Sequence, residues 1–210
     1  MIWLTELLDN DQVNLYLQEF KTENFKKAEP IGMGIHVKHS HITTDRYRTS
    51  THYREVSKHV WGSLNPLTEE YYLKRASQPY FCWYEEGDYY DWHRDNYPIG
   101  GVNSDLSMTL FLNDDYEGGE LLIKVGDVVT SHKPKAGTVI LYETGLWHKV
   151  NKVTKGSRKV IVAWHESIIQ NSHIRREMIA MGRELKEENP RWDNIKQSQV
   201  NLIREYSRPV

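Results

Sequence analysis

Two residues near the middle of the chain, His93 and Asp95, have the types and the spacing of a metal site. They fall in the segment 89–95, whose aromatic residues favour a β-strand. Side chains two apart on a strand point to the same face, so this imidazole and carboxylate can bind one ion. On a helix they would point to nearly opposite sides. The pair therefore predicts a metal site only if the segment is extended.

Two later residues extend the pattern: His148, in or beside a late strand, and Arg158, at the start of another apolar strand. Two imidazoles and one carboxylate leave positions open on an octahedral ion, as in non-haem Fe(II) sites. A structural zinc site is expected to have a fourth protein ligand, and no cysteine is placed to supply it. An inward-facing Arg158 suits a dicarboxylate co-substrate, because a planar guanidinium pairs with both carboxylate oxygens. Lys159 is then expected to face away.

Each of these residues also has an ordinary structural interpretation. His93 alone is compatible with a half-buried histidine, and Asp95 with the cap of the turn that follows it. His148 suits a turn, and Arg158 suits an ion pair with a surface acid. The metal site is favoured by the combination of the four residues in this order.

The remaining histidines and the single cysteine are weaker candidates. His132 and His165 lack an acidic partner in a His-x-Asp pattern, and strand alternation places His165 on the outer face. We therefore interpret both as structural. His39 and His41 form a weak candidate for a second metal site, and Cys82 is expected to be a small core residue.

Length and composition limit the class of protein. A chain of 210 residues is long enough for a single β-rich domain. The net charge of -2 and the pI near 6.6 predict no general binding of nucleic acid. One cysteine excludes an intrachain disulfide framework and fits a reducing compartment. The first residues lack the basic region of a signal peptide, and no apolar run has the length of a bilayer span, so we expect a cytoplasmic protein without a membrane partner.

The segment 80–167 is predicted to form about eight short strands joined by Gly-rich and Pro-rich turns. This pattern favours a jelly roll or a related barrel as the fold. The predicted strands are Tyr80–Tyr84, Tyr89–Asp95, Leu106–Asn113, Glu120–Val125, Val128–His132, Thr138–Glu143, Trp147–Val153 and Arg158–His165.

The flanking segments, 1–79 and 168–210, are predicted to be mainly helical and to belong to the same domain. The loops 40–51 and 96–105 are expected to border the site, and one of them to close over it. The C-terminal helices carry enough apolar residues to pack on the barrel or to form a homodimer contact. The predicted helices are Leu4–Phe20 with a break near Asp9, Tyr53–Leu64, Thr68–Ser77, one that ends at Pro190, and Trp192–Tyr206, with a short strand within Ala28–His41.

Residues 80–167 resemble the Fe(II)/2-oxoglutarate-dependent dioxygenases of the prolyl 4-hydroxylase type, and within them the bacterial and phage PKHD-type hydroxylases. The resemblance rests on several motifs in a fixed order. They are Tyr-Tyr-Asp-Trp-His-Arg-Asp at 89–95, Ser-Asp-Leu-Ser-Met-Thr-Leu-Phe-Leu-Asn at 104–113, Tyr-Glu-Gly-Gly-Glu-Leu at 116–121, Ala-Gly-Thr-Val-Ile-Leu-Tyr at 136–142, His-Lys-Val at 148–150 and Lys-Gly-Ser-Arg at 155–158.

The resemblance implies a double-stranded β-helix, a form of jelly roll, with His93, Asp95 and His148 as iron ligands. Arg158 is expected to bind the distal carboxylate of 2-oxoglutarate, and Tyr84 to contact the same co-substrate. The implied cofactors are Fe(II), 2-oxoglutarate and O2, with ascorbate as reductant. The implied reaction hydroxylates an unactivated C–H bond while 2-oxoglutarate is decarboxylated to succinate and CO2.

The sequence leaves the primary substrate open among peptidyl proline, a free amino acid and another small molecule. Two other functions are compatible with the same fold: a cupin-like metal-dependent isomerase and a non-catalytic binding barrel. Neither of them explains why Arg158 should accompany an open-sided metal site.

Overall fold

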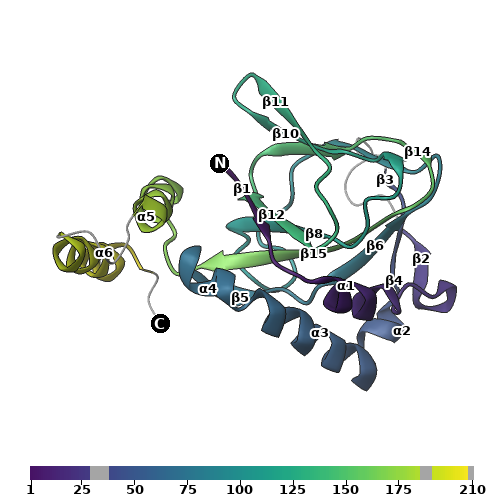
Figure 1. The fold of residues 1–210 in the computed structure, drawn as a ribbon, viewed down its shortest axis with the longest axis horizontal. Helices are drawn as coiled ribbons and strands as arrows, with labels where there is room; N and C mark the ends of the chain where they lie inside the picture. The colour runs from purple at the N-terminus through teal and green to yellow at the C-terminus, as the bar shows by residue number, and fades with distance from the viewer. Residues whose placement is uncertain (29–37, 185–190, 208–210) are drawn as a thin grey trace.

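Two facing antiparallel β-sheets form the centre of the computed structural model, which describes residues 1–28, 38–184 and 191–207 (Figure 1). The larger sheet has the strand order β1-β12-β8-β15-β6-β4-β2, and β5 also pairs with β15. Its strands are β1 (Ile2–Glu6), β2 (Phe25–Lys27), β4 (His41–Thr43), β5 (Leu73–Ala76), β6 (Tyr80–Tyr84), β8 (Leu106–Phe111), β12 (Thr138–Glu143) and β15 (Arg158–Ser167).

The smaller sheet has the order β11-β10-β13-β7-β3, and its β10–β11 hairpin extends beyond the rest of the barrel (Figure 1). A separate two-stranded sheet joins β9 (Glu117–Gly118) to β14 (Val153–Lys155). The strands of the smaller sheet are β3 (Lys38–His39), β7 (Tyr89–His93), β10 (Leu121–Val125), β11 (Val128–His132) and β13 (Trp147–Val150). The predicted jelly roll with flanking helices is confirmed.

The core has two parts, one on each face of the larger sheet. Leu110 and Ile161 belong to the cluster on the outer face, together with residues of α1 (Asn10–Leu17) and α3 (Thr51–Leu64). Their strand neighbours Phe111 and Val160 belong to the cluster between the two sheets. Because both faces are covered, every residue of β8 is buried. The helices thus support the sheet that carries Arg158 without entering the space between the sheets.

The predicted strands of the segment 80–167 are present, with small changes at their ends. The segment predicted as Trp147–Val153 divides into β13 and β14, and β7 ends at His93. The helices predicted at Tyr53–Leu64 and Trp192–Tyr206 are confirmed as α3 and α6 (Trp192–Tyr206). The Ser50 hydroxyl begins α3 by accepting a hydrogen bond from the Tyr53 backbone N–H at 3.1 Å.

The helix predicted over Leu4–Phe20 is wrong in its first part. Residues 2–6 form β1, and α1 begins only after Asp9. β1 pairs with β12 at the edge of the larger sheet, a long-range contact that local apolar spacing does not reveal. The start of α1 is local, because Asp9 and Gln12 each accept a hydrogen bond from the other's backbone N–H.

The helix predicted over Thr68–Ser77 is also wrong. Helix α4 (Pro66–Glu70) is short, and the chain then continues as β5 beside β15. Pro66 suits the first turn of a helix because its φ is fixed. Tyr72, at φ +55°, turns the chain out of the helical direction. The pairing of β5 with β15 therefore overrides the local helical pattern.

The segment Ser40–Thr51 is not the predicted loop. It contains β4, α2 (Asp45–Arg48) and the first residue of α3. Thr44 and Ser50, which made the segment look like a loop, cap the two helices. The short strand predicted within Ala28–His41 falls mainly on residues 29–37, which lie outside the described residues.

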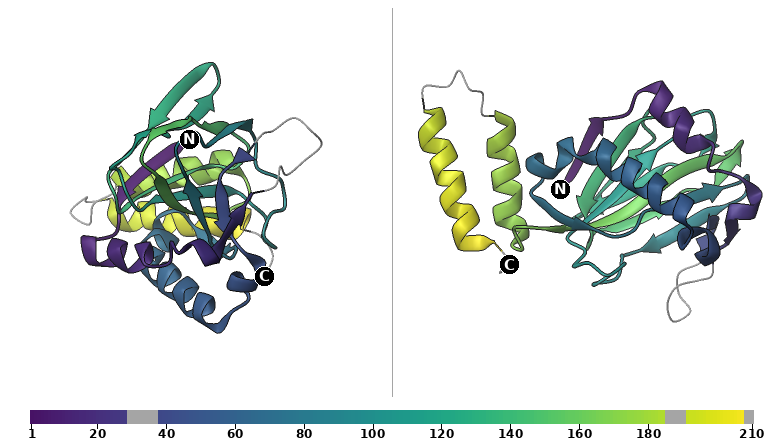
Figure 2. Two further views of the ribbon diagram at one scale, coloured as in Figure 1. Left: turned by 90° about the vertical axis from the view of Figure 1, so that its right-hand side faces the viewer. Right: turned by 90° about the horizontal axis from the view of Figure 1, so that it is seen from below.

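The C-terminal helices stand at one end of the barrel, where α5 (Ser172–Glu184) separates α6 from the sheets (Figure 2). Arg175, which is buried, anchors α5: its guanidinium donates to Glu143 at 2.6 Å and to the Ile169 carbonyl at 2.8 Å. Met178 and Ile179 are also buried. The tail thus packs on the barrel through α5, and the homodimer contact stays a prediction. No helix of the described residues is long and apolar enough to cross a bilayer.

His165 lies on the outer face of β15, as strand alternation predicts. Its ring packs edge-on against Trp61 with centroids 5.6 Å apart, and it is fully buried. Burial lowers the pKa of His165 to about 4 from its ordinary value of 6.5. The unfolded chain therefore binds a proton between these two pH values and the folded chain does not, so this histidine destabilises the fold as the pH falls.

We expect the free energy of unfolding to decrease as the pH is lowered from 6.5 to 4, with His165 contributing up to about 3 kcal/mol. His165→Phe retains an aromatic ring beside Trp61, and its stability should depend less steeply on pH in this range. Urea titrations at several pH values measure the difference. His173→Phe, at an exposed position on α5, is the control and should keep the wild-type slope. Equal slopes for wild type and His165→Phe would contradict the account.

Candidate metal centre

His93 and His148 face each other across neighbouring antiparallel strands, β7 and β13. Both side chains point between the two sheets, where they are 3% and 4% exposed. Their ring centroids are 4.1 Å apart. The register of the smaller sheet therefore brings together two imidazoles that are far apart in the sequence.

Asp95 completes the group, although it lies beyond the end of β7 rather than within the strand as predicted. Its direction comes from the larger sheet: its Oδ2 accepts hydrogen bonds from Ser107 Oγ at 2.7 Å and from Trp164 Nε1 at 2.8 Å. Ser107 also contacts Thr144 Oγ1 at 3.0 Å. Side-chain hydrogen bonds, rather than strand alternation, thus place this carboxylate beside the histidines.

The ligand atoms of His93, Asp95 and His148 lie within 4.8 Å of one another. The Asp95 carboxylate oxygens are 3.9 Å from His93 Nε2 and 3.7 Å from His148 Nε2. Ligand atoms bound to one metal ion at about 2.1 Å are separated by at most about 4.2 Å. The two Asp95 distances are too long for hydrogen bonds and lie below this limit, so the carboxylate is close enough to share one ion with each histidine. Among the side chains that the structure describes, no other group has this arrangement.

The two histidines are oriented by their other ring nitrogens. Nδ1 of His93 is 2.8 Å from the Asp91 carbonyl oxygen, and Nδ1 of His148 is 3.0 Å from that of Leu146. A carbonyl oxygen only accepts, so each Nδ1 carries the hydrogen and donates it. Each Nε2 then presents a lone pair on the side of Asp95, which is the tautomer that a metal requires.

A β-bulge in β7 adds Tyr90 to the inner face. His93 pairs with His148 and Tyr90 pairs with Val150, so β7 has one residue more than β13 between these pairs. Without the extra residue, side chains three apart would point to opposite faces. With it, the Tyr90 ring stacks on His93 with centroids 3.5 Å apart and an angle of 20° between the planes. The bulge therefore fixes the plane of the imidazole.

Arg158 lies at the start of β15, opposite Tyr84 of β6, and is 1% exposed. Its guanidinium carbon is 5.1 Å from the ring centroids of both Tyr84 and Phe111. Nε has no hydrogen-bond partner, and no described carboxylate lies within 4.0 Å of the guanidinium. Lys159 points to the opposite face, toward Trp83, as predicted. Arg158 is therefore a buried cation that has no counter-ion among the residues described.

One cavity connects this cation to the three candidate ligands. Its lining includes Tyr84, His93, Asp95, His148 and Arg158, with apolar and aromatic side chains between them. Burial raises the pKa of Tyr84, so its phenol stays protonated at neutral pH and can donate a hydrogen bond. Tyr142 lines the same cavity, and burial, with a smaller contribution from the Asp95 charge, raises its pKa well above the ordinary value.

The donor set and the cavity fit the predicted cofactors. Two Nε2 atoms and one carboxylate suit Fe(II) and leave several of its positions open. A buried guanidinium without an acid is strongly disfavoured unless an anion joins it, and a dicarboxylate that reaches the metal would do so. The residues present therefore fit an iron ion together with an anionic co-substrate.

The rival histidines lie elsewhere. His132 Nε2 contacts Thr130 Oγ1 on the β10–β11 hairpin, and His165 is on the outer face of β15. His41 Nδ1 is 3.7 Å from an Asp88 carboxylate oxygen, while the side chain of His39 falls outside the described residues. Cys82 is buried, as expected, and lines the cavity that connects Arg158 to the three candidate ligands.

Comparison with known proteins agrees with this geometry. Residues 80–166 match the family model described as the 2OG-Fe(II) oxygenase superfamily. A PKHD-type hydroxylase of Rippkaea orientalis is 32% identical over 179 residues, which cover 81% of this chain and 80% of that protein. The chain belongs to the 2OG-Fe(II) oxygenase superfamily and, within it, to the PKHD-type hydroxylases.

A PKHD-type hydroxylase of Acaryochloris marina is 36% identical over 135 residues, or 60% of this chain. The match spans only 62% of the length of that relative. The fold is shared with a prolyl-4-hydroxylase of Pseudomonas putida, with a TM-score of 0.60 and 17% identity over 79% of this chain and 92% of that chain. At this identity the likeness shows the jelly-roll fold alone.

Four residues around the site were not assigned a role from the sequence: Tyr90, Ser107, Tyr142 and Trp164. Tyr142 and Ser107 are cross-strand partners on β12 and β8, so neither has a local link to the His-x-Asp pair. Trp164 is six residues after Arg158 on β15 and so shares its face, but alternation gives no partner for the indole N–H. Only the pairing of the two sheets shows that Trp164 and Ser107 meet Asp95.

We predict that Asp95→Ala weakens Co(II) binding by more than about 100-fold, and that Ser107→Ala, which removes a hydrogen bond to the ligand, weakens it by about tenfold. Calorimetric titration measures both effects, and circular dichroism should show an unchanged fold. Asp91→Ala removes an exposed carboxylate near the site and is the control. If Asp95→Ala binds Co(II) as tightly as wild type, Asp95 is not a ligand.

Proposed function

We propose that the protein is an Fe(II)/2-oxoglutarate-dependent dioxygenase that hydroxylates an unactivated C–H bond. The observation that carries the proposal is the buried, unpaired guanidinium of Arg158 in the same cavity as the open-sided group of His93, Asp95 and His148. In the overall reaction one oxygen atom of O2 enters the substrate C–H bond and the other enters succinate, while 2-oxoglutarate loses CO2. Ascorbate, as an external reductant, is part of the same proposal.

Each residue of the site has a distinct task in this reaction. His93, His148 and Asp95 hold the iron, and Ser107 and Trp164 fix the carboxylate by donating to one of its oxygens. The iron, when bound, supplies the activation of O2 and chelation of the keto acid.

The other end of the co-substrate is bound by Arg158 and Tyr84. The Arg158 fork pairs with both oxygens of the distal carboxylate, and the protonated phenol of Tyr84 is placed to donate a further hydrogen bond. Phe111 and Val160, in the cluster between the sheets, keep water from this ion pair.

For the primary substrate we propose a prolyl residue of a peptide. The name of the Pseudomonas putida neighbour supports this choice, while a free amino acid or another small molecule would need the same metal centre. A cupin-like isomerase or a binding barrel would have no use for a buried cation beside an open metal site. We propose a cytoplasmic location, as the sequence predicts. A homodimer contact through the C-terminal helices is likewise a proposal.

We predict that Arg158→Ala weakens the binding of 2-oxoglutarate by roughly 30-fold to several thousand-fold, because truncation leaves a carboxylate in an apolar pocket at a cost of about 2–5 kcal/mol. Arg158→Lys should recover part of the loss, since an ammonium cannot form the two parallel hydrogen bonds. Lys159→Ala, on the outer face, is the control. Anaerobic titration of each Fe(II)-loaded variant with 2-oxoglutarate, followed by the metal-to-ligand charge-transfer band, measures binding.

The reaction is tested by supplying the same variants with O2, ascorbate and proline-containing peptides. The measured products are succinate and a peptide whose mass has increased by one oxygen atom. His93→Ala and Asp95→Ala should form no succinate. A strong loss of binding in Lys159→Ala with none in Arg158→Ala would contradict the assignment of the co-substrate. Succinate without an oxidised peptide would contradict the prolyl substrate but leave the dioxygenase proposal in place.

A further inference from the structure

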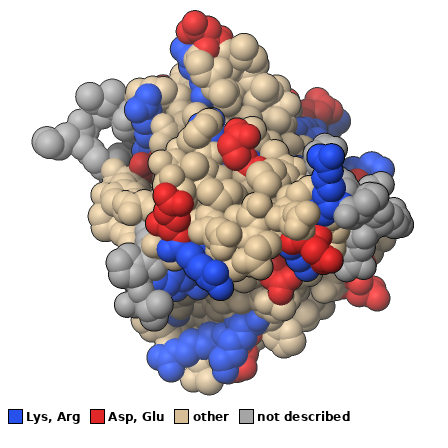
Figure 3. Space-filling view, turned by 90° about the vertical axis from the view of Figure 1, so that its left-hand side faces the viewer, with Lys and Arg blue, Asp and Glu red and all other residues tan. Residues whose placement is uncertain are grey.

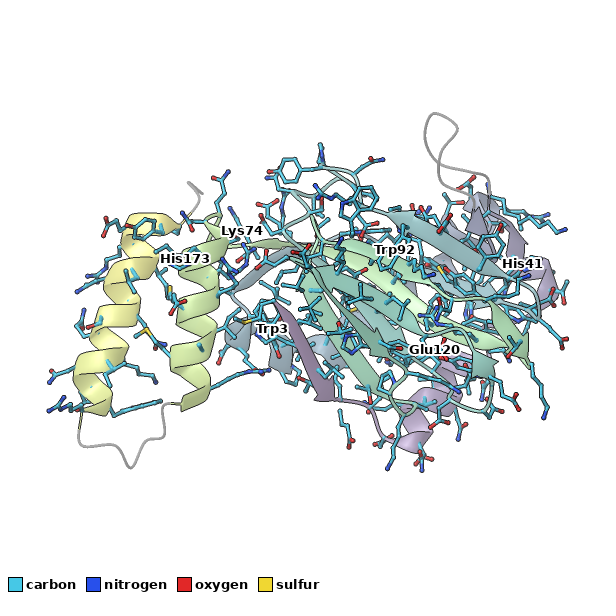
Figure 4. The ribbon with its side chains drawn as sticks, turned by 90° about the horizontal axis from the view of Figure 1, so that it is seen from above. Trp3, His41, Lys74, Trp92, Glu120 and His173 are labelled. Carbon is cyan, nitrogen blue, oxygen red and sulfur yellow. The ribbon has the colours of Figure 1, made fainter. Side chains whose placement is uncertain are left out.

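The outer face of the smaller sheet carries a group of aromatic and basic residues behind the metal centre. Because His93 and His148 point inward, the residues on either side of each point outward. These neighbours are Trp92 of β7, Arg94 just after β7, and Trp147 and Lys149 of β13. Figure 4 shows Trp92 on the barrel, far from the C-terminal helices that carry His173. Helices α1 and α3 lie on the side of the larger sheet (Figure 1).

Two cation–π pairs hold charged groups of this face over tryptophan rings. The Arg94 guanidinium carbon is 5.0 Å from the ring centroid of Trp147, and Lys149 Nζ is 5.5 Å from that of Trp92. Lys124 of β10 is the cross-strand partner of Trp147. We call these five residues, Trp92, Arg94, Lys124, Trp147 and Lys149, the basic sheet face.

The three cations of the basic sheet face have no acidic partner within the described part of the chain. Among the side chains that the structure describes, no carboxylate lies within 4.0 Å of Arg94, Lys124 or Lys149. Some exposed lysines elsewhere are paired, as Lys26 is with Asp45 at 2.9 Å and Lys58 with Glu55 at 2.8 Å. The nearby acid in sequence, Asp91, accepts instead from the backbone of Trp92. Three unneutralised charges on one face are notable in a chain with a net charge of -2.

Charges of both signs alternate on another surface of the molecule. The end of the protein at α5 and α6 shows Lys and Arg beside Asp and Glu (Figure 3). Such a mixture is ordinary for a solvated surface. The basic sheet face differs from this end of the molecule, because no described carboxylate lies within 4.0 Å of its three cations.

We propose that the basic sheet face is a docking surface for an acidic segment of a protein partner. A cation held against a tryptophan ring loses little side-chain freedom when it binds a carboxylate, and its N–H edges remain directed to solvent. Trp147, which is 38% exposed, and Val129 of β11, which is 48% exposed, add apolar area for the side chains between the acids. The partner is recognised by carboxylates spaced along an extended segment.

A peptide fits this face better than a nucleic acid. Nucleic-acid bases bind proteins by stacking on open aromatic faces, and here each tryptophan ring already has a cation over it. The exposed valines of the β10–β11 hairpin suit aliphatic side chains rather than phosphates. The proposal does not depend on the reaction in the cavity, because it concerns the opposite face of the same strands.

Fluorescence anisotropy with a labelled 16-residue peptide of alternating Glu and Gly tests the proposal in the full-length protein. Wild type should bind this peptide, more weakly as NaCl is added, and should not bind the matching Gln-Gly peptide. The triple variant Arg94→Gln, Lys124→Gln and Lys149→Gln should bind at least about tenfold more weakly. Unchanged Co(II) binding by this variant verifies that His93 and His148 remain in place.

The control is a second triple variant with the same change in charge: Lys21→Gln, Lys27→Gln and Lys196→Gln. Lys196 Nζ also lies over a tryptophan ring, that of Trp192 of α6, at 4.9 Å from the centroid. The control therefore tests whether one cation–π pair is enough to bind the peptide. The control should bind the Glu-Gly peptide within about twofold of wild type. Equal weakening by both triple variants, or binding of the Gln-Gly peptide, would overturn the proposal. A third outcome would also overturn it: a 16-nucleotide oligo-dT binds wild type more tightly than the Glu-Gly peptide does, and the first triple variant abolishes this binding while the control does not. That result would identify a nucleic-acid surface.

Discussion

The buried guanidinium of Arg158 is the feature on which the rest of the site depends. A cation enclosed between two sheets, over the rings of Tyr84 and Phe111 and without an acid, is unfavourable unless an anion occupies the cavity. The fold supplies its position through the pairing of β15 with β6 and β8, which fixes both the depth and the direction of the side chain. The charge therefore selects an anionic ligand before any metal chemistry begins.

The metal centre joins the two sheets rather than belonging to one of them. The smaller sheet contributes His93 and His148, while Ser107 and Trp164 of the larger sheet hold Asp95. A relative shift of the sheets would separate the carboxylate from the imidazoles. The helices packed on the outer face of the larger sheet thus support the site without contributing a ligand. That the flanking segments and the barrel form one domain stays a prediction.

Sequence patterns predicted what depends on local periodicity. Alternation placed Arg158 inside and Lys159 and His165 outside. The caps at Asp9 and Ser50 are local signals too, but the sequence was interpreted there as a break and a loop. Patterns failed where distant pairing decides the structure.

Strands β1 and β5 look helical in isolation and become strands only because β12 and β15 offer them partners. For the same reason the hydrogen bonds of Asp95, and the bulge that turns Tyr90 inward, could not be predicted.

The outer and inner faces of β7 and β13 have separate tasks in this account. The inner face holds the candidate iron ligands, and the outer face holds cations against tryptophan rings. Because alternate residues of the same strands serve both, a one-residue slip in register would exchange them.

The most direct measurement is a double-mutant cycle between Arg158 and the distal carboxylate of the co-substrate. Fe(II)-loaded wild type and Arg158→Ala are titrated without oxygen with 2-oxoglutarate and with 2-oxobutyrate, which keeps the keto acid but lacks that carboxylate. Wild type should prefer 2-oxoglutarate by about 30-fold or more, and Arg158→Ala should have almost no preference. An undiminished preference in Arg158→Ala would show that another group binds the carboxylate and that Arg158 is not its partner.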